Sequence, residues 1–392
     1  MRRKRVVFLA AHLLSPTVAS GGDILFCEIA NRLRRLHPEW EIMAVAPDFC
    51  KEALSAYFER VDTFATPASD GRQGGPANVA ATWAGRLARV TRTLRNLDPD
   101  LIHTTGDFFV DVLPSLWVRR TTGCRWTGVV HHVNAAPHKR RNSLAVATVS
   151  FALQRGSFAA LKNADAILLL NEGVRSELRA LGFRADRLNV VGAGIDIDKF
   201  PLVRPPDKRT RVAWLNRLEP TKGIFDLPQI AARLPDDVVM DVIGSGPQVF
   251  VDRLASELRQ RKLESKCVLR GFLPHPDLLE ALAAASVFIS CSYEEGFGIS
   301  IAEALASGIP CITYDLPSHR EIFGDRIARV PLGDTESFAR AIESALRAGD
   351  TPETRLLRRE SVAELSFDSC ARRQEAVFER LMVTMPARAE RV

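Results

Sequence analysis

The chain has 392 residues, of which 46% are hydrophobic and 26% are charged. This length suits two or three domains, and the composition excludes wholesale disorder, a collagen triple helix and a coiled coil. Residues 1–199 carry 27 Lys and Arg against 19 Asp and Glu, a net charge of +8, whereas residues 200–392 carry 26 against 28. The acid-free segment between Asp111 and Asp165 holds much of this excess. We therefore expect an anionic partner for the first half, either a charged acceptor or an acidic membrane surface.

The cysteines and the N-terminus bear on the compartment. Seven widely spaced cysteines without a C-x-x-C motif favour a reduced, cytoplasmic chain. The basic residues 2–5 and the apolar residues 6–14 resemble a signal peptide, but His12 interrupts the apolar run and no cleavage site follows closely. We predict a buried first strand there instead. The weakly polar stretch 144–153 is shorter than the roughly 18 apolar residues of a membrane span, so we expect none.

Short apolar runs alternate with amphipathic segments, which is the pattern of parallel strands covered by helices. A Pro-rich, charged stretch at 201–209 interrupts the pattern, which then restarts. We therefore predict an α/β protein with two doubly wound Rossmann-like domains, 1–200 and 201–366, facing across a cleft, and a C-terminal segment, 367–392, whose residues 367–382 form an amphipathic helix. The predicted strands are 6–11, 41–46, 101–104, 127–131, 166–170, 188–191, 212–215, 238–243, 268–269, 287–290, 309–314 and 327–330.

Two glutamates form the strongest candidate site. Glu295 lies in a Gly-bracketed loop after a predicted strand, and Glu303 follows eight residues later, on the order of 12 Å away on a helix. This spacing suits a nucleotide-sugar, with one carboxylate on the sugar hydroxyls and the other on the ribose. Free amides at the helix start, at Gly298 and Ile299, would bind a phosphate. The alternative is a helix-start acid and a solvated helix residue, but the flanking alanines of Glu303 indicate close packing.

A pair of cations, Arg217 and Lys222, follows another predicted strand. We expect both at or just before a helix start, where the helix dipole disfavours positive charge. An anion between them would resolve this conflict, and a diphosphate fits because Arg grips it bidentately while Lys supplies a mobile charge. The alternative is two solvated surface cations.

Glycines and histidines follow other predicted strands. The loops with Gly21 and Gly22 and with Gly244 and Gly246 admit close approach of a ligand, although tight turns alone would explain them. His131 ends a strand, where it would point into the cleft toward a transferred sugar. Two D-x-D sequences, 98–100 and 196–198, imitate a metal motif, but one opens a strand and the other adjoins the linker, so we predict no metal there.

This arrangement resembles glycosyltransferase family 4, the retaining GT-B glycosyltransferases, along nearly the whole chain. The glutamate pair with the Arg-x4-Lys pair is the specific part, and the order of the remaining motifs adds to it. The resemblance implies that Glu295 contacts the donor sugar, Glu303 the ribose, and Arg217 with Lys222 the diphosphate. It further implies that His131 lines the sugar, Gly21 and Gly22 admit the phosphates, and the final helix crosses back to the first domain.

The same resemblance implies retaining transfer from a nucleoside-diphosphate-sugar to a glycan or lipid-linked acceptor, with no metal or other cofactor. The chain departs from many relatives at 192–194, where it has Gly-Ala-Gly, and at His131-His132, which leaves open which histidine faces the sugar. Alternatives are a sugar-nucleotide epimerase, a phosphorylase and a catalytically silent nucleotide-sugar-binding scaffold. A nucleic-acid binder is disfavoured because aromatic residues make up only 7% of the chain and no recognition motif accompanies the arginines.

The basic segment 139–155 is compatible with two structural interpretations. Residues 139–155 have a cationic start and an apolar body, which suits either a helix lying on an anionic membrane or a core helix with a solvated start. Peripheral attachment at the inner face of the membrane would bring the enzyme to a lipid-linked acceptor.

Overall fold

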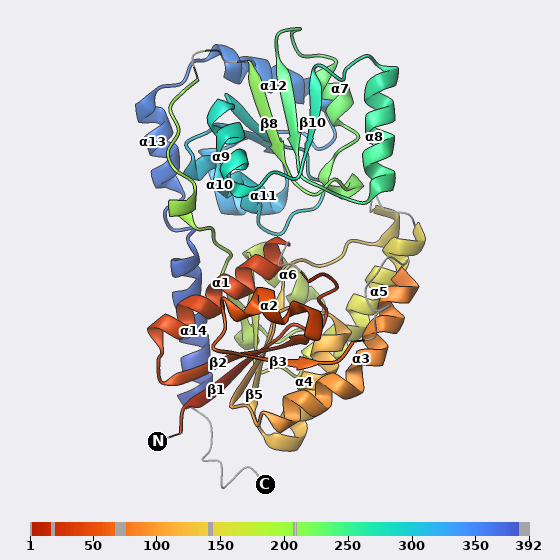
Figure 1. Ribbon diagram of the computed structural model, residues 1–392, viewed down its shortest axis with the longest axis vertical. Coiled ribbons are helices and arrows are strands. Elements are labelled where there is room, and N and C mark those ends of the chain that lie inside the picture. Colours follow the sequence, from red (N-terminus) through yellow and green to blue (C-terminus); the bar gives the residue numbers. More distant parts are fainter. Residues whose placement is uncertain are drawn as a thin grey trace. The chain divides into compact units, whose positions relative to one another are not determined.

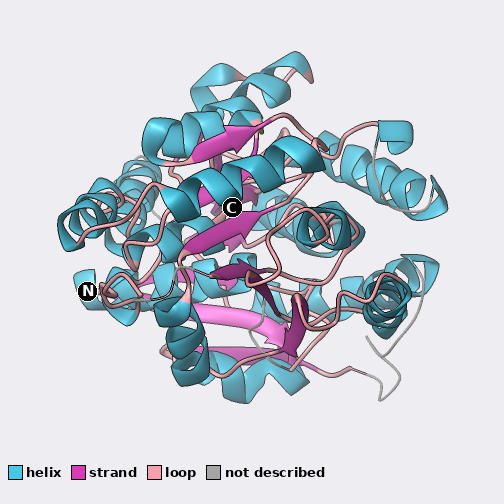
Figure 2. Ribbon diagram, turned by 90° about the horizontal axis from the view of Figure 1, so that it is seen from above, coloured by secondary structure: helices cyan, strands magenta, loops and turns pink. Residues whose placement is uncertain are grey.

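The computed structural model describes residues 2–16, 20–66, 76–139, 144–206, 208 and 210–383. The chain divides into two compact units. Unit 1 contains residues 1–194 and 367–392, and unit 2 contains residues 195–366. Each unit has a parallel sheet between layers of helices (Figures 1 and 2).

Unit 1 has a seven-stranded parallel sheet in the order β3-β2-β1-β4-β5-β6-β7. Its centre is a continuous apolar core that includes the fully buried Trp126, and such near-continuous apolar strands are typical of sheets covered on both faces. The strands are β1 (Lys4–Leu9), β2 (Trp40–Pro47), β3 (Arg60–Phe64), β4 (Leu101–Thr104), β5 (Arg125–Val130), β6 (Ala166–Leu169) and β7 (Leu188–Val190). The helices are α1 (Gly21–Leu36), α2 (Lys51–Ser55), α3 (Pro76–Asn96), α4 (Phe109–Thr122), α5 (Leu144–Leu161), α6 (Glu172–Ala180) and α14 (Phe367–Val383).

Unit 2 has a six-stranded parallel sheet in the order β10-β9-β8-β11-β12-β13. Trp214 and Phe338 are fully buried in its core. The strands are β8 (Arg211–Leu215), β9 (Val239–Ile243), β10 (Cys267–Gly271), β11 (Val287–Ser290), β12 (Cys311–Tyr314) and β13 (Ala328–Val330). The helices are α7 (Leu227–Ala231), α8 (Gln248–Gln260), α9 (His275–Ala284), α10 (Ile299–Ala306), α11 (Pro317–Phe323), α12 (Thr335–Arg347) and α13 (Pro352–Ser361).

The strand order of each sheet identifies where a ligand would bind. The strand order reverses between β1 and β4 in unit 1 and between β8 and β11 in unit 2. Ligands of doubly wound sheets bind outside the carboxyl ends of the strands at such a reversal. The predicted doubly wound α/β class is therefore confirmed, and the loops after β1, β4, β8 and β11 are the places to look for a site.

All twelve predicted strands are present, and one strand, β3, was missed. Its sequence, Arg60 to Phe64, contains two charged residues, and only Phe64 is buried. Strand β3 forms the edge of the sheet, pairing with β2 alone. It therefore lacks the apolar run that reveals a central strand.

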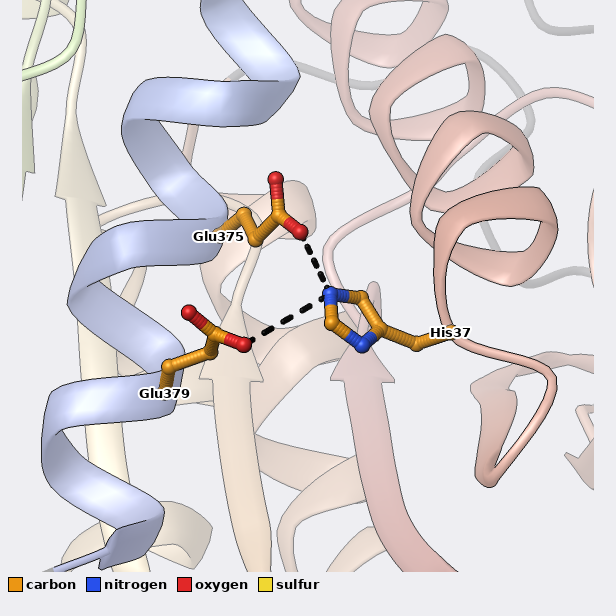
Figure 3. A group of neighbouring side chains, drawn as sticks. All are labelled: His37, Glu375 and Glu379. Carbon is orange, nitrogen blue, oxygen red and sulfur yellow. Dashed lines mark hydrogen bonds and ion pairs between the residues drawn. The ribbon is translucent and has the colours of Figure 1, made fainter.

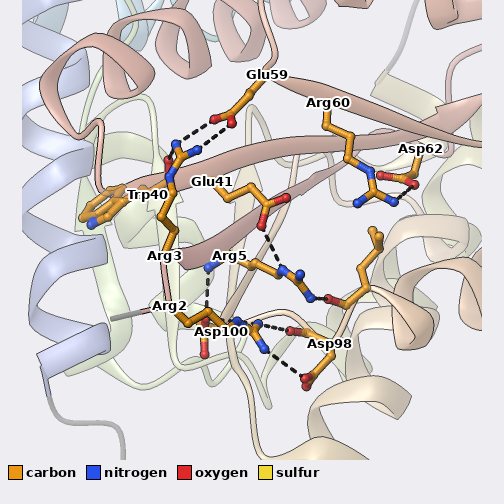
Figure 4. A network of polar contacts seen from close by, with 11 residues as sticks. Arg2, Arg3, Arg5, Trp40, Glu41, Glu59, Arg60, Asp62, Asp98 and Asp100 are labelled. Atoms are coloured by element: carbon orange, nitrogen blue, oxygen red, sulfur yellow. Dashed lines mark hydrogen bonds and ion pairs between the residues drawn. The ribbon is translucent and has the colours of Figure 1, made fainter.

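The predicted buried first strand is confirmed, and the arginines before and within it have local partners (Figure 4). Arg2 binds Asp98, and the backbone amide of Arg5 donates to Asp100 Oδ2 at 2.9 Å. Arg3 binds Glu59 through two hydrogen bonds of 2.5 and 2.7 Å. The aspartates of the first D-x-D sequence therefore pair with arginines at the amino ends of the strands.

Helix α5 covers most of the predicted helical segment 139–155 and continues to Leu161. It extends the apolar stretch 144–153 to 18 residues, and by length and composition alone it is apolar enough to cross a membrane. The helix packs against α4 and α3, and 28% of it is buried inside the protein. The core helix of a soluble protein passes the same test. Residues 140–143, which carry part of the predicted basic start, lie outside the described residues.

Candidate functional site

The loops after β8 and β11 are joined at the switch point of unit 2. Gly223 has a positive φ of 72°, and a Cβ atom there would lie 2.0 Å from the carbonyl oxygen of Cys291, so only glycine allows this approach. The amide of Tyr293 donates to the carbonyl of Thr221 at 2.8 Å. The Tyr293 hydroxyl group also donates a hydrogen bond to Asp226 Oδ2 at 2.6 Å. These contacts fix one loop against the other.

Lys222 and Glu295 form an ion pair across these two loops. Lys222 Nζ lies 2.7 Å from Glu295 Oε2, and the two side chains are 12% and 16% exposed. Burial raises the pKa of Glu295, but the charge and hydrogen bond of Lys222 outweigh it and hold this pKa below its usual range. Ser318 Oγ donates to the Glu295 carbonyl at 2.8 Å, so α11 also holds the loop. The structure thus brings together two of the predicted site residues.

The prediction that Arg217 and Lys222 lie at or just before a helix start is wrong. Lys222 ends a short 3-10 turn, Pro220–Lys222, and helix α7 begins only at Leu227. Neither cation therefore lies at a helix start. Arg217 is 62% exposed and binds Glu219 of its own loop at 2.9 Å. The negative partner of Lys222 is Glu295, and Arg217 extends toward solvent.

The glycines after β9 pack against the Arg217 loop. A Cβ atom at Gly244 would lie 1.9 Å from the Asn216 carbonyl oxygen, and one at Gly246 would lie 2.3 Å from that of Leu218. The absence of side chains at these positions is therefore required by the protein's own backbone. Close packing against the loop that carries Arg217 therefore explains why glycine stands at both positions.

Glu303 lies on α10, which begins after Gly298 in a left-handed conformation, φ 97°. The side chain is half-buried, between the fully buried Ala302 and Ala304, so it is not a solvated helix residue. Burial raises the pKa of Glu303 to about 8. Glu303 is therefore mainly protonated at neutral pH, in contrast to Glu295.

His319 is a residue that the sequence analysis missed. It is fully buried on α11, and its Nδ1 atom lies 3.0 Å from the Tyr314 carbonyl oxygen, to which it donates. Its Nε2 atom has no hydrogen-bond partner among the described residues. Burial lowers the pKa of His319, and the Glu295 carboxylate opposes this shift. The only sequence signal was its position shortly after β12.

In unit 1, the predicted glycines begin α1, and His131 lies against them. Ser20 caps the helix, and a Cβ atom at Gly22 would lie 3.4 Å from the His131 ring. His131 Nε2 lies 3.3 Å from the Thr105 carbonyl oxygen, whereas His132 is exposed. Gly22 and His131 also line an internal cavity of about 20 Å³. This volume is enough for one water molecule and far too small for a sugar.

Buried charges surround His131 that no sequence motif indicated. His12, after β1, binds Asp111 at 2.8 Å, and Asp111 also accepts from the amide of Ala11. Burial raises the pKa of Asp111, although His12 opposes this shift. Burial likewise raises the pKa of Asp107, which accepts from Gln154 of α5 at 2.7 Å. The signal available in the sequence was an acid after β4 and another in the first turn of α4.

Comparisons with protein families agree with this geometry. Residues 197–356 match the model described as glycosyl transferases group 1, and residues 21–194 match the glycosyl transferase 4-like domain. The two doubly wound units define the class of protein as GT-B. Since the two matches together span most of both units, the chain belongs to glycosyltransferase family 4.

Curated relatives share about a quarter of their aligned residues with this chain. O-antigen chain mannosyltransferase B of Escherichia coli is 26% identical over 233 residues, which cover 56% of this chain and 61% of that protein. Glycogen synthase of Mycobacterium tuberculosis is 25% identical over 276 residues, 67% of this chain and 64% of the synthase. The chain thus spans less than two thirds of these two relatives. D-inositol 3-phosphate glycosyltransferase of Xylanimonas cellulosilytica is 26% identical over 424 residues and 99% of both chains.

Solved structures show the same fold. Sucrose-phosphate synthase of Thermosynechococcus elongatus matches with a TM-score of 0.79 at 19% identity, covering 97% of this chain and all of that one. Anabaena HepE in complex with UDP-glucose matches with a TM-score of 0.74 at 16% identity, covering 96% and 99%. At these identities the likeness concerns the fold alone.

The raised pKa of Glu303 predicts a pH-dependent stability. Between the unfolded pKa near 4.3 and the folded pKa near 8, the folded state holds a proton that the unfolded state has lost, so stability falls as pH rises. Glu303→Gln mimics the protonated form. We expect it to match the wild type near pH 4.5 and to be more stable at pH 8.5 by up to about 5 kcal/mol, in urea unfolding.

Glu336→Gln, at an exposed position on α12, is the matched control and should give no pH-dependent difference. Parallel stability curves for Glu303→Gln and the wild type from pH 4.5 to 8.5 would show that Glu303 is ionised throughout.

Proposed function

We propose that the protein is a retaining glycosyltransferase that moves a hexose-type sugar from a nucleoside-diphosphate-sugar to a hydroxyl of a glycan or lipid-linked acceptor. We place it in the cytoplasm, in cell-envelope or exopolysaccharide synthesis. The observation that carries the proposal is the buried Lys222–Glu295 pair at the switch point of unit 2, with Glu303 on the helix that follows. This site would combine a cation for the phosphates with two carboxyl groups, of which Glu295 is ionised and Glu303 is mainly protonated.

The diphosphate gains negative charge when the sugar leaves it. We propose that two cations and two backbone amides bind the diphosphate and stabilise this charge. Lys222 and Arg217 would neutralise the departing diphosphate, and the amides of Gly298 and Ile299 would bind its oxygens, which is electrostatic stabilisation of developing charge. Two cations at this position allow metal-free transfer. A diphosphate would also compete with Glu295 for Lys222 and release this carboxylate toward the sugar.

The remaining roles concern the sugar and the ribose. Glu295, once released, would accept hydrogen bonds from sugar hydroxyls, and Glu303 from the ribose. His131 would contact the transferred sugar, and Gly21 and Gly22 would admit phosphates. Burial lowers the pKa of His131, so its neutral ring can accept a hydrogen bond. In retaining transfer the acceptor hydroxyl attacks from the face that the nucleotide leaves, and a phosphate oxygen takes its proton.

The relatives support a nucleotide-sugar donor. The Escherichia coli relative is a mannosyltransferase of the O-antigen chain, and the Anabaena structure holds UDP-glucose. Similar donor chemistry would also suit an epimerase or a silent binding scaffold. An epimerase converts the donor without an acceptor, and a scaffold binds it unchanged, so product analysis separates the three.

The donor class can be tested by thermal shift with UDP, GDP, ADP and their sugar conjugates on EDTA-treated protein. A ligand that binds only the folded state raises the unfolding midpoint. We expect one nucleotide family to raise it, and Lys222→Ala and Glu303→Ala to reduce the shift. Glu295→Ala should lower turnover without weakening nucleotide binding, because it frees Lys222 for the diphosphate. Arg326→Ala is the control: it removes an ion pair with Glu364, outside the candidate site, and should leave the nucleotide-induced rise of the unfolding midpoint unchanged.

An absent shift with every nucleotide, or unchanged kinetics in the three site variants, would contradict the site assignment. A shift without transfer to any acceptor would favour the scaffold.

We further propose that unit 1 contacts an anionic membrane. A groove of about 510 Å³ lies between α3 and α4, lined by apolar residues and by Arg92 and Arg95. Trp117 is 44% exposed in this groove, with the Arg95 guanidinium 5.5 Å from its ring centroid. Leu144, at the start of α5, is also exposed. Exposed apolar side chains next to arginines suit an interface of acyl chains and anionic headgroups.

Vesicle sedimentation tests this attachment. We expect the protein to sediment with phosphatidylglycerol vesicles but not with phosphatidylcholine vesicles. Arg92→Gln together with Arg95→Gln should weaken vesicle binding on the order of 30-fold, since each cation near the surface contributes about 1 kcal/mol. Arg253→Gln, on α8 of unit 2, is the matched control. Equal sedimentation with both vesicle types, or with neither, would refute attachment through this groove.

A further inference from the structure

His37 is held in a fixed orientation at the end of α1. Its ring is stacked on Trp40, with centroids 3.8 Å apart and planes 8° from parallel. Its Nδ1 atom lies 2.7 Å from Glu39 Oε1, so this nitrogen donates its proton to a carboxylate. A carboxylate on one ring nitrogen is the arrangement that orients metal-binding histidines, because it leaves the other nitrogen as the ligand. Nε2 is therefore the coordinating atom that His37 offers.

Two carboxylates from α14 converge on this nitrogen (Figure 3). Glu375 and Glu379 are four residues apart, so they project from the same face of the helix. Glu375 Oε1 lies 2.6 Å from His37 Nε2, and Glu379 Oε1 lies 4.0 Å from it. One ring nitrogen can donate only one proton, and Glu375 already accepts it. The second carboxylate is therefore not explained by a hydrogen bond.

The distances suit a bound divalent ion. Metal–nitrogen and metal–oxygen bonds of 2.0–2.2 Å in a tetrahedral site place ligand atoms about 3.4 Å apart. The two observed distances, 2.6 and 4.0 Å, lie on either side of this value, and all three ligand atoms lie within 4.8 Å of one another. A movement of under about 1 Å by each flexible glutamate would complete the geometry.

Charge and access also favour a cation. Three carboxylates, Glu39, Glu375 and Glu379, surround one imidazole, so the negative groups outnumber the single ring that pairs with them. The side chains of His37, Glu375 and Glu379 are 11%, 20% and 53% exposed, so two of the ligands are largely buried while the side of Glu379 remains open for an ion and water.

We propose that His37, Glu375 and Glu379 bind a divalent transition metal ion, with Zn²⁺ as the best match to one nitrogen and two carboxylate oxygens. The ion replaces the Nε2 proton and takes water as its fourth ligand. It joins α14 to the end of α1, two helices that pack together and are also joined by the Arg32–Asp368 ion pair. Because α1 has 16 residues, this site lies about 24 Å from Gly21, and its role is structural.

The test is calorimetric titration of tag-free, EDTA-stripped, full-length protein with Zn²⁺. We expect one ion per chain at this site and a rise of the thermal midpoint that EDTA reverses. Glu379→Gln keeps the His37–Glu375 hydrogen bond and should reduce Zn²⁺ affinity at least tenfold. Asp368→Asn, which alters another carboxylate on the same helix, should change the affinity less than twofold.

His37→Gln should abolish binding at this site, and Glu379→Gln provides the comparison if that variant folds poorly. The proposal is overturned if Glu379→Gln binds Zn²⁺ as tightly as the wild type, or if Zn²⁺ raises the midpoint of both equally. Nucleotide thermal shifts that persist in Glu379→Gln would show that this site and the donor site are independent.

Discussion

The Lys222–Glu295 ion pair is the interaction on which the account of unit 2 depends. It joins the loops after β8 and β11 at the reversal of the strand order, where a doubly wound sheet has its ligand crevice. Removing one partner of a buried pair leaves an uncompensated charge and commonly costs about 3–5 kcal/mol. An incoming diphosphate can replace Glu295 as the partner of Lys222 without leaving that charge unpaired. The pair therefore stabilises the two loops against each other, and under the proposed function it would hold Lys222 ready for the diphosphate.

Two carboxyl groups in this region differ because their surroundings differ. Glu295 faces a lysine, which holds its pKa below the usual range, whereas Glu303 lies between buried alanines, and burial raises its pKa to about 8. Ribose hydroxyls that donate to Glu303 would favour its ionised form, so binding of a nucleotide would lower this pKa. One helix and its preceding loop thus carry an ionised carboxylate, Glu295, and a mainly protonated carboxyl group, Glu303.

The sequence was sufficient for the fold class because apolar runs mark central strands, and it failed at β3, an edge strand with charged residues. It was also sufficient to bring Lys222 and Glu295 into one candidate site, because loops after parallel strands share one edge of a sheet. It could not show that they pair with each other. The predicted helix start at the two cations was wrong, because a 3-10 turn follows β8 and helix α7 begins only at Leu227. His12, Asp111 and His319 escaped notice since their burial depends on tertiary packing. The pairing of His37 with α14 is likewise beyond sequence, because His37 and Glu375 are 338 positions apart.

The most direct test of the central claim is the affinity of Glu295→Gln for a nucleoside diphosphate without sugar, measured by calorimetry beside Lys222→Met and the wild type. If Glu295 competes with the diphosphate for Lys222, the Gln variant should bind the nucleotide severalfold more tightly, while Lys222→Met should bind it at least tenfold more weakly. An affinity of Glu295→Gln that equals or falls below that of the wild type would contradict the claim that the ion pair holds Lys222 in reserve for the diphosphate.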